Sequence, residues 1–491
     1  MTNEVDKRVD LEDVLVKFNI FGRYHSWMLL LILLPNIYTG ITCLNYVFAA
    51  EPIEYRCKND INATCGSNTC SEWIYDNPNS LVAEFQLACE EWKRTLVGSS
   101  HNVGYMAGLC IVGPISDRLG RKASIVLTSV LSAMMGLAKS FTSSYWLYVS
   151  LEFLEAVVGC TFSPVYLFAV EIVATKKRIT YITLCNLGWY IGAVFVAVIG
   201  WLFQYWRSYL RAIYGPPLLF IFYLYLMDES PRWLLTNGRK EEATAIMKKA
   251  ARMNKMTIDN KVLDNLSAQE EYSLKFVELL KTTFASRTIL KRFIICFFWW
   301  TASAFVNYGI IINSVSLQGN KYLNFGILSF IDIPGTLLYI FVLKYLKRKY
   351  SLMLTFLIGA ILCLIQPLVP TDLQWLSITL YMTGKLMSTL YFDTTYLFTS
   401  ELFPTYTRNS MHGLCSGLGR FGSIAAPMTP LLMVYWSGLP SLIFGCVALF
   451  ASFLTIFVPD TSDCSLPDTV KQAEALGSKP KLKDDENASS V

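Results

Sequence analysis

The feature that most constrains this chain is a series of long apolar runs that recur along most of its length. A run of about 18 or more residues is long enough for an α-helix to cross about 30 Å of hydrocarbon. Hydrophobic residues make up 53% of the sequence and charged residues only 16%, whereas about a quarter of the residues in a soluble domain are charged. We therefore expect an all-α polytopic membrane protein.

Twelve apolar runs are predicted to be transmembrane helices, at 24–48, 93–115, 123–141, 145–170, 179–201, 209–227, 291–313, 322–344, 351–369, 374–399, 409–434 and 440–458. A polar stretch divides them six and six. The expected regions are an N-terminal segment at 1–23, a six-helix bundle at 24–227, a polar insert at 228–290, a second bundle at 291–458 and a tail at 459–491. Because the tail is polar and charged, we expect it to be disordered.

Two short helices are expected outside the spans. Within residues 10–20, apolar residues recur at helical spacing, namely Leu11, Val14, Leu15 and Phe18. Helical patterning also covers 239–253 in the polar insert. Residues 1–23 carry both signs of charge and no apolar core, so they are not expected to be a cleaved signal peptide.

Cations gather in the loops on one side of the predicted spans. The stretch Gly113–Lys122 places three cations and one acid between two spans. Further cations follow later spans on the same side, namely Lys176, Lys177, Arg178, Lys344, Lys347, Arg348, Lys349 and Arg408. An excess of Lys and Arg marks loops that stay in the cytoplasm. Both termini and the polar insert are therefore expected to be cytoplasmic.

The long loop at 49–92 is then extracellular. It holds four cysteines, Cys57, Cys65, Cys70 and Cys89. An even number predicts two disulfides but leaves three connectivities open. Asn62-Ala63-Thr64 in the same loop is a glycosylation sequon. Disulfides and a sequon favour the secretory route and the plasma membrane.

The two predicted bundles carry a weak internal repeat. Glu171 and Arg178 follow the fourth span with the same seven-residue step that separates Glu401 from Arg408 after the tenth. Weak repeats in matching halves are typical of a two-bundle transporter, whose substrate site lies near mid-membrane between the halves.

Three motifs in register carry a resemblance to a known family. The spacing Gly-x-x-x-Asp-Arg-x-Gly-Arg-Lys over Gly113–Lys122 looks like the loop 2–3 signature of the major facilitator superfamily of transporters. The run Glu229–Leu235 resembles the signature of that superfamily's organic cation/anion/zwitterion transporters (solute carrier family 22-like). Glu401–Thr405, followed by Arg408, is similar to the family's span 10–11 signature. The chain departs from the family at Leu151–Glu155, where acids stand in place of an arginine-bearing segment.

The resemblance implies the major facilitator fold, with twelve helices in two pseudo-symmetric six-helix bundles. It also implies transport by alternating access, in which the two halves rock about a central substrate site.

Ionisable residues inside membrane spans are costly and usually face a cavity or a partner; here they are Glu152, Glu155, Asp332, Lys385, Asp393 and Arg420. Arg420 shares a helical face with a stripe of small residues, Gly413, Ser416 and Gly417. Small residues allow close helix approach, and an arginine grips a carboxylate with two parallel hydrogen bonds. The resemblance implies an acid at this position in cation-selective members and arginine in anion and carnitine-type zwitterion transporters. A buried pair with Asp393 or Asp332 is the alternative for Arg420.

Further candidate substrate contacts lie on other spans. Lys385 and Phe392 resemble positions that line the central cavity of anion-transporting relatives, and Trp189 is similar in place to a cavity aromatic. The full candidate set is Arg420, Lys385, Phe392, Asp393, Asp332, Trp300, Phe305, Asn307, Tyr308 and Trp189. Helix packing is the alternative for each aromatic residue. Lys385 adds positive charge to the predicted site while the two aspartates subtract it.

Charged residues of the cytoplasmic motifs form a candidate gate, namely Asp117, Arg118, Arg121, Glu171, Arg178, Glu229, Arg232, Glu401 and Arg408. Solvated surface charge is the alternative, worth about 0–1 kcal/mol per pair. As a gate, such pairs would link the two halves while the protein faces outward.

The sequence therefore predicts a secondary or facilitative carrier of small organic anions or zwitterions that bear a carboxylate. An organic cation carrier that uses Asp332 and Asp393, and a non-transporting relative that acts as a sensor, are the alternatives. No nucleotide-binding loop, nucleophile–base motif or metal motif is present among its residues, so we expect no enzyme activity, no cofactor and no metal. The expected partners are a small organic solute and the lipid bilayer, with no nucleic acid, and we expect a monomer to function.

Overall fold

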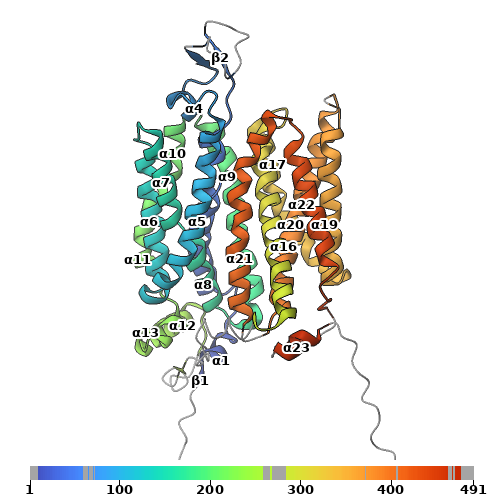
Figure 1. Ribbon diagram of the computed structural model, residues 1–491. Coiled ribbons are helices and arrows are strands. Elements are labelled where there is room, and N and C mark those ends of the chain that lie inside the picture. Colours follow the sequence, from blue (N-terminus) through green and yellow to red (C-terminus); the bar gives the residue numbers. More distant parts are fainter. Residues whose placement is uncertain are drawn as a thin grey trace, which may run out of the picture.

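The computed structural model describes residues 9–58, 65, 70, 72–257, 266–267, 284–370, 372–404, 407–462, 467 and 470–476. Two helical bundles stand side by side (Figure 1). The N-terminal half consists of α2 (Arg23–Thr42), α3 (Tyr46–Ala49), α5 (Glu91–Leu119), α6 (Arg121–Lys139), α7 (Tyr145–Val158), α8 (Phe162–Glu171), α9 (Arg178–Leu202), α10 (Trp206–Tyr214), η2 (Pro216–Phe222) and α11 (Tyr223–Leu226).

The C-terminal half repeats this arrangement. It consists of α16 (Arg287–Asn313), η3 (Ser314–Ser316), α17 (Lys321–Phe330), α18 (Asp332–Tyr345), α19 (Arg348–Ile365), η4 (Gln366–Leu368), α20 (Gln374–Leu402), α21 (Arg408–Ala425), η5 (Ala426–Val434) and α22 (Leu439–Thr455). Helices cover each predicted span, and the predicted all-α fold of two helical bundles is confirmed.

Eight of the spans are long and apolar enough to cross a membrane by length and composition alone. The other four contain α5, α20, α21 and α22. Of these, α22 is only 17 residues long. The remaining three carry glycines, hydroxyls and charges along their length. Polar side chains on a spanning helix belong where other helices or a cavity cover them.

The two ends of the molecule are distinct (Figure 1). One end carries α4 (Leu81–Glu84) and the antiparallel pair β2 (Tyr55–Cys57) and β3 (Trp73–Tyr75). Disulfides Cys57–Cys70 and Cys65–Cys89 close this loop and select one of the three possible connectivities. We call this end the disulfide face. The sequon residue Asn62 lies outside the described residues.

The other end, the insert face, carries short helices from both halves: α1 (Leu11–Leu15), α12 (Pro231–Thr236), α13 (Lys240–Met253) and α23 (Val470–Ala475). The parallel pair β1 (Val9–Asp10) and β4 (Leu266–Ser267) ties the N-terminal segment to the insert. The amphipathic residues predicted near the N-terminus, Leu11, Val14, Leu15 and Phe18, are all buried.

The prediction for the polar insert is confirmed, whereas the prediction for the tail is partly wrong. The helix predicted at 239–253 is confirmed as α13. The prediction of a disordered tail is wrong for Val470–Ala475, which form α23. Ala473 is buried there, and Arg292 of α16 donates to the carbonyl oxygens of Ala473 and Leu476. These bonds satisfy carbonyl groups that a short helix leaves unpaired at its end.

The halves meet chiefly near the disulfide face. There α5 packs against α21 and η5, while α9 packs against α17. Ser99 donates to the carbonyl oxygen of Ile424 at 2.9 Å, and the ring of Phe48 stacks on that of Tyr322 with centroids 5.2 Å apart. Between the halves, Lys321 lies 2.7 Å from Glu51.

Candidate functional site

Arg420 projects from α21 toward the opposite half. Its guanidinium lies over the ring of Tyr105 on α5, 5.1 Å from the centroid. Tyr308, Cys43 and Cys160 complete its electrostatic surroundings. The described residues offer it no carboxylate within ion-pair distance, so the alternative of a buried pair with an aspartate does not hold in this structure.

The small residues before Arg420 face open space. A Cβ atom added at Gly413 or Gly417 would meet no heavy atom of the described chain within 4 Å. The expectation that this stripe permits close helix approach is therefore wrong. The close approach uses another face of α21, where Gly422 lies against the backbone of Thr301 on α16. Arg420 thus stands between the packed end of α21 at the disulfide face and an open stretch toward the insert face.

Lys385 and Asp332 form a buried pair inside the C-terminal half. Lys385 Nζ lies 3.1 Å from Asp332 Oδ1 and donates to Asn307 Oδ1 at 2.9 Å. Thr389 donates its hydroxyl to Asp332 Oδ1 at 2.5 Å. Asp332 opens α18, where the helix dipole favours a negative charge. The two charges neutralise each other, so this pair carries no net charge.

Asp393 is held differently. Thr336 of α18 donates its hydroxyl to Asp393 Oδ2 at 3.2 Å, and the same hydroxyl lies 3.2 Å from the phenol oxygen of Tyr190. Tyr190 belongs to α9, so the contact joins the two halves. Within the described chain no lysine or arginine forms an ion pair with Asp393.

The predicted aromatic residues divide into two groups. Tyr308 belongs to the surroundings of Arg420, and Trp189 packs edge-on against Phe162 within the N-terminal half. Trp300 is buried and donates to Thr399, and Phe392 and His412 pack around its ring. Phe305 packs against Phe444. The packing alternative therefore describes Trp300 and Phe305 better than contact with a substrate.

Sequence reasoning missed three residues of this region, Tyr105, Tyr190 and Thr336. Each lies in an apolar run where a tyrosine or threonine looks like an ordinary packing residue. Their positions become informative only when α5, α9 and α18 are placed against Arg420 and Asp393.

The charged motifs of the insert face form one network in each half. In the N-terminal half, Arg121 lies 2.8 Å from both Glu171 Oε1 and Asp117 Oδ1. Glu229 accepts the backbone N–H groups of Arg121 and Lys122 at 2.9 and 3.1 Å. Burial raises the pKa of Glu229 even though these donors oppose the shift.

The C-terminal half repeats this geometry with other residues. Arg348 opens α19 and lies 3.4 Å from Glu401 at the end of α20, as Arg121 does with Glu171. Asp460 accepts the backbone N–H of Lys349 at 3.4 Å. Arg348 was not among the predicted gate residues, because its motif lacks the aspartate of the first half.

The other gate candidates lie near these networks. Arg232 lies 3.1 Å from Glu12, and Arg178 donates to the carbonyl oxygen of Val170 at 3.1 Å. Arg118 is exposed, and Arg408 opens α21. The pairs of Arg121 with Asp117 and Glu171 lie within the N-terminal half, and the pair of Arg348 with Glu401 lies within the C-terminal half.

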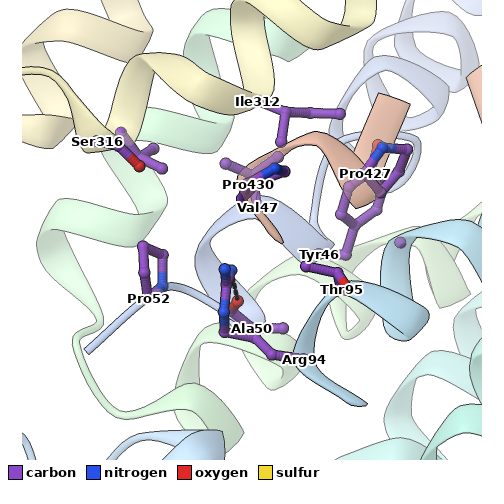
Figure 2. A pocket seen from close by; sticks show the side chains of 12 residues that line it. Tyr46, Val47, Ala50, Pro52, Arg94, Thr95, Ile312, Ser316, Pro427 and Pro430 are labelled. Atoms are coloured by element: carbon purple, nitrogen blue, oxygen red, sulfur yellow. Dashed lines mark hydrogen bonds between the residues drawn. The ribbon is translucent and has the colours of Figure 1, made fainter. Parts of the chain in front are cut away.

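A small pocket opens at the disulfide face between the halves (Figure 2). Tyr46, Arg94 and Thr95 line it from the N-terminal half, and Ile312, Pro427 and Pro430 from the other half. Gly98 makes this contact possible, since an added Cβ would lie 2.7 Å from the ring of Tyr46 and 2.8 Å from Pro427.

The sequence matches the model of the sugar (and other) transporter family over residues 62–469. The chain is 32% identical to an organic cation transporter protein of Drosophila melanogaster, with 84% of this chain and 78% of the relative aligned. It is 31% identical to solute carrier family 22 member 1 of Oryctolagus cuniculus, over 84% and 75%. It is 30% identical to the organic cation/carnitine transporter 2 of Homo sapiens, over 80% and 72%.

Solved structures agree on the fold. The partially occluded inward open conformation of the xylose transporter XylE from E. coli superposes with a TM-score of 0.66 at 17% identity, over 90% of this chain and 99% of the other. The structure of the D-xylose-proton symporter gives a TM-score of 0.62 at 17% identity, over 89% and 99%.

Proposed function

The chain belongs to the sugar (and other) transporter family and, within the major facilitator superfamily, to solute carrier family 22, and from this premise we propose that it carries small organic cations. A carrier of small organic solutes in a membrane, rather than an enzyme, follows from the family. The choice of a cation is our proposal. It replaces our first expectation of an organic anion or zwitterion by the cation alternative.

The observation that carries the cation proposal is the carboxylate of Asp393, which has a hydroxyl partner but no cationic partner among the described residues. The names of two similar proteins, from fly and human, point the same way, since both contain the words organic cation. Asp332 is a weaker candidate, because Lys385 already neutralises it.

A carnitine-like zwitterion is the second candidate solute. Arg420 is free of carboxylate partners in the described chain and is placed to bind one from a solute. One relative's name also includes carnitine. A zwitterion would use both charges, with its ammonium near Asp393 and its carboxylate near Arg420.

We propose that the structure represents an inward-facing state, with the disulfide face extracellular. Disulfides form in oxidising compartments, which supports an extracellular position for that loop and cytoplasmic termini. Contacts near the disulfide face hold the halves together. Between Arg420 and the insert face, by contrast, α21 faces open space at Gly413 and Gly417. The plasma membrane remains our proposed location.

Uptake of three labelled solutes tests the proposal: tetraethylammonium, L-carnitine and p-aminohippurate. Tetraethylammonium has no N–H group, so its attraction to Asp393 is Coulombic. For unit charges about 4 Å apart it amounts to about 1 kcal/mol in water and about 4 kcal/mol near a protein surface, which is about fivefold or more in affinity. Asp393→Asn is expected to reduce tetraethylammonium uptake by that factor. Arg420→Ala is expected to reduce carnitine uptake and spare tetraethylammonium.

The matched control is Asp372→Asn, which changes an exposed acid in a loop of the same half. Surface expression of each variant is measured by labelling the extracellular loop. Tetraethylammonium uptake that survives Asp393→Asn would contradict the assignment of Asp393. Transport of p-aminohippurate alone would return the function to the anion expectation.

We also propose that the two networks of the insert face lock the halves together when the carrier faces outward. The predicted gate residues Asp117 and Arg408 are the ones to change. Asp117→Asn and Arg408→Ala are expected to slow the transport cycle while surface expression persists. Unchanged transport kinetics in both variants would exclude the lock.

A further inference from the structure

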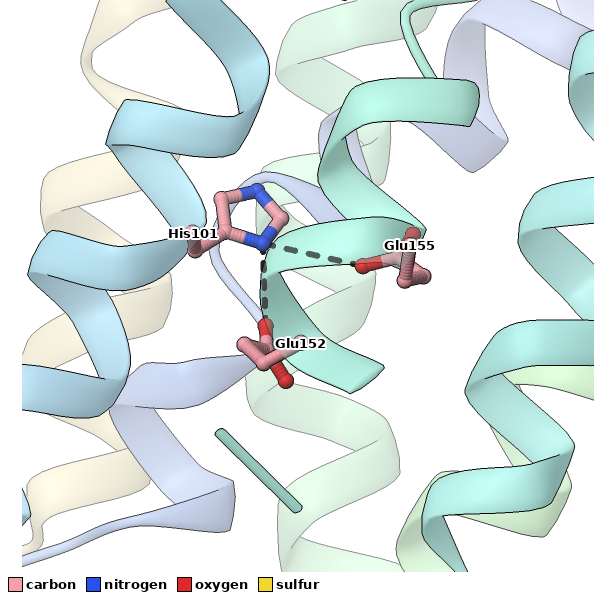
Figure 3. A group of neighbouring side chains, drawn as sticks. All are labelled: His101, Glu152 and Glu155. Carbon is pink, nitrogen blue, oxygen red and sulfur yellow. Dashed lines mark hydrogen bonds and ion pairs between the residues drawn. The ribbon is translucent and has the colours of Figure 1, made fainter. Parts of the chain in front are cut away.

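Four ionisable side chains meet inside the N-terminal half, at a site that does not include Arg420. His101 comes from α5, Lys139 from α6, and Glu152 and Glu155 from α7. Their exposed fractions are 3%, 0%, 0% and 1%, respectively. Figure 3 shows His101 pointing between the two carboxylates. We call these four residues the buried quartet. Buried ionisable groups in a membrane protein are costly and call for a function.

The distances within the quartet fix how the protons are shared. His101 Nδ1 lies 2.9 Å from Glu152 Oε1 and 3.6 Å from Glu155 Oε2. Lys139 Nζ lies 2.6 Å from Glu152 Oε2 and 3.5 Å from Glu155 Oε2. Because Nδ1 faces carboxylate oxygens, it carries a proton and donates it. The lone pair of the neutral imidazole is then at Nε2.

A charge count shows that the quartet lacks one positive charge. Two carboxylates and one ammonium leave a net charge of minus one when His101 is neutral. A proton on His101 Nε2 brings the sum to zero. Within the described chain, His101 Nε2 and Glu155 Oε2 are buried atoms without a hydrogen-bond partner. The quartet can therefore accept one more proton, at His101 Nε2.

The surroundings supply hydroxyl and amide groups. Two neighbours come from other parts of the half. Asn45 donates to Glu152 at 3.4 Å, and the phenol oxygen of Tyr214 accepts a hydrogen bond from Lys139 at 3.1 Å. Ser132 donates to Glu155 at 2.6 Å. The charges of Glu152 and Glu155 also act on four further tyrosines, namely Tyr38, Tyr46, Tyr148 and Tyr209.

A metal ion is a poorer occupant than a proton. His101, Glu152 and Glu155 offer a set of ligand atoms close enough to hold one. The ammonium of Lys139, however, already lies against both carboxylates, where a metal cation would have to bind. Two cations in that place would repel each other, whereas a proton on the far nitrogen of His101 does not compete with Lys139.

The quartet is connected to both parts of the transport path. The ring of Tyr46 lies 5.7 Å from that of His101, and Tyr46 also lines the pocket at the disulfide face. Parting of the halves there would remove Pro427 from Tyr46 and Gly98 and bring solvent close to His101. On the other side, Ala156, which follows Glu155 on α7, packs in one buried cluster with Tyr105, whose ring lies under Arg420.

We propose that the buried quartet is a proton-binding site, which takes up one proton at His101 Nε2 from the disulfide side when the halves part there and releases it later in the cycle. The proton comes from bulk water, no bond other than N–H is formed or broken, and the net charge of the quartet alternates between zero and minus one. Proton movement is thereby coupled to solute movement. This coupling rests on the proposed transport function.

The test of coupling uses proteoliposomes with the membrane potential clamped by potassium and valinomycin. Uptake of labelled tetraethylammonium and L-carnitine is measured with and without a proton gradient of about two pH units. A gradient is expected to change uptake by the parent chain several-fold. His101→Gln is expected to abolish the response while solute exchange at equal pH persists.

Glu155→Gln is the second variant. It makes the quartet neutral without a proton, so its uptake is expected to be insensitive to the gradient. The control is His25→Gln, which changes another buried histidine, one that lies 3.2 Å from the carbonyl oxygen of Ile172. It is expected to keep the response. A gradient response that survives both His101→Gln and Glu155→Gln would overturn the proposal, as would a response to sodium at constant pH.

Proton binding is tested separately on the purified protein, so that it does not depend on the choice of solute. The chain has only three histidines, so ¹⁵N-histidine NMR resolves them by substitution. The His101 signal is the one that disappears in His101→Gln, and it is expected to change from the neutral to the protonated form as the pH is lowered. A His101 signal that does not titrate overturns the proton site even if transport is shown.

Discussion

At the scale of single residues, the chemistry of this carrier depends on which charges are already paired. Lys385 and Asp332 share a buried pair, whereas Asp393 and Arg420 lack ionic partners among the described residues. In surroundings of low polarity an unpaired charge attracts an opposite charge strongly, whereas a paired charge is already largely neutralised. We therefore expect solute selection to depend on the unpaired charges rather than on all the charged residues of the spans.

Removal of one member of the buried pair tests this distinction. Breaking a buried ion pair leaves an uncompensated charge and costs about 3–5 kcal/mol, whereas replacement of both members by apolar residues is often neutral. Lys385→Met and Asp332→Leu are each expected to lower the thermal stability of the detergent-solubilised protein. The double variant is expected to recover most of the loss. Additive losses in the double variant would show that the two side chains do not act as a pair.

At the scale of elements, α21 has two glycine faces with opposite roles. An added Cβ at Gly422 would lie 2.1 Å from the carbonyl oxygen of Thr301 and 2.8 Å from the backbone nitrogen of Phe305. At Gly417 it would meet open space. The Gly422 face holds α21 against α16, and the Gly417 face borders the open space between Arg420 and the insert face.

The two faces predict opposite effects of the same substitution. Gly422→Ala pushes two backbones apart, and overpacking of this kind typically costs about 1–3 kcal/mol. Gly417→Ala has no clash and removes a weak helix former, which favours the helix by up to about 1 kcal/mol. Thermal unfolding of both variants measures the contrast. Equal losses of stability would contradict the assignment of the two faces.

A second contact between elements holds the disulfide-closed loop at the disulfide face, and we expect this contact to depend on pH. Glu84 of α4 accepts hydrogen bonds from Arg207 Nε at 3.1 Å and from Trp206 Nε1 at 2.7 Å. The bonds from Arg207 lower the pKa of Glu84. A lowered pKa in the folded state stabilises the docked loop above the unfolded pKa, and this contribution is lost as pH falls through the folded pKa.

Acidification is therefore expected to release α4 from α10, and hydrogen exchange of residues 81–88 reports it. Exchange protection should fall with pH in the parent chain beyond the intrinsic pH dependence of amide exchange. In Glu84→Gln the protection should be lower at neutral pH and vary less with acidification. Identical profiles in the two proteins would show that this carboxylate does not dock the loop.

At the scale of the whole molecule, the sequence predicted the architecture far better than the site. Hydropathy and loop charge act locally, so the twelve spans and their division follow from short windows. The partners of Arg420 do not, because Tyr105 lies more than 300 positions away. Lys139 lies near the end of the predicted span 123–141 and was not among the ionisable span residues that the sequence singled out, yet it is fully buried against Glu152. The spacing of Gly413 and Gly417 was correct, but spacing alone does not tell which helix face meets a neighbour.

The closed disulfide face gives a prediction for the whole transport cycle. Gly98 lies between the ring of Tyr46 and Pro427 of the other half, with no room for a side chain. Gly98→Leu is therefore expected to hold the halves apart at this face and to shift the population toward the outward-facing state. Transport should fall strongly, because the cycle needs both states.

A thiol reporter measures the shift directly. Thr95 is buried at this interface, and its hydroxyl lies 3.3 Å from Met428 Sδ of the other half. In a Thr95→Cys background, Gly98→Leu should speed labelling by a membrane-impermeant thiol reagent, relative to Thr95→Cys alone. Gly113→Leu on the same helix is the control, since an added Cβ there meets no described atom within 4 Å. If both leucine variants label at the same rate, the contact at Gly98 does not close the disulfide face, and the inward-facing assignment loses its main mechanical support.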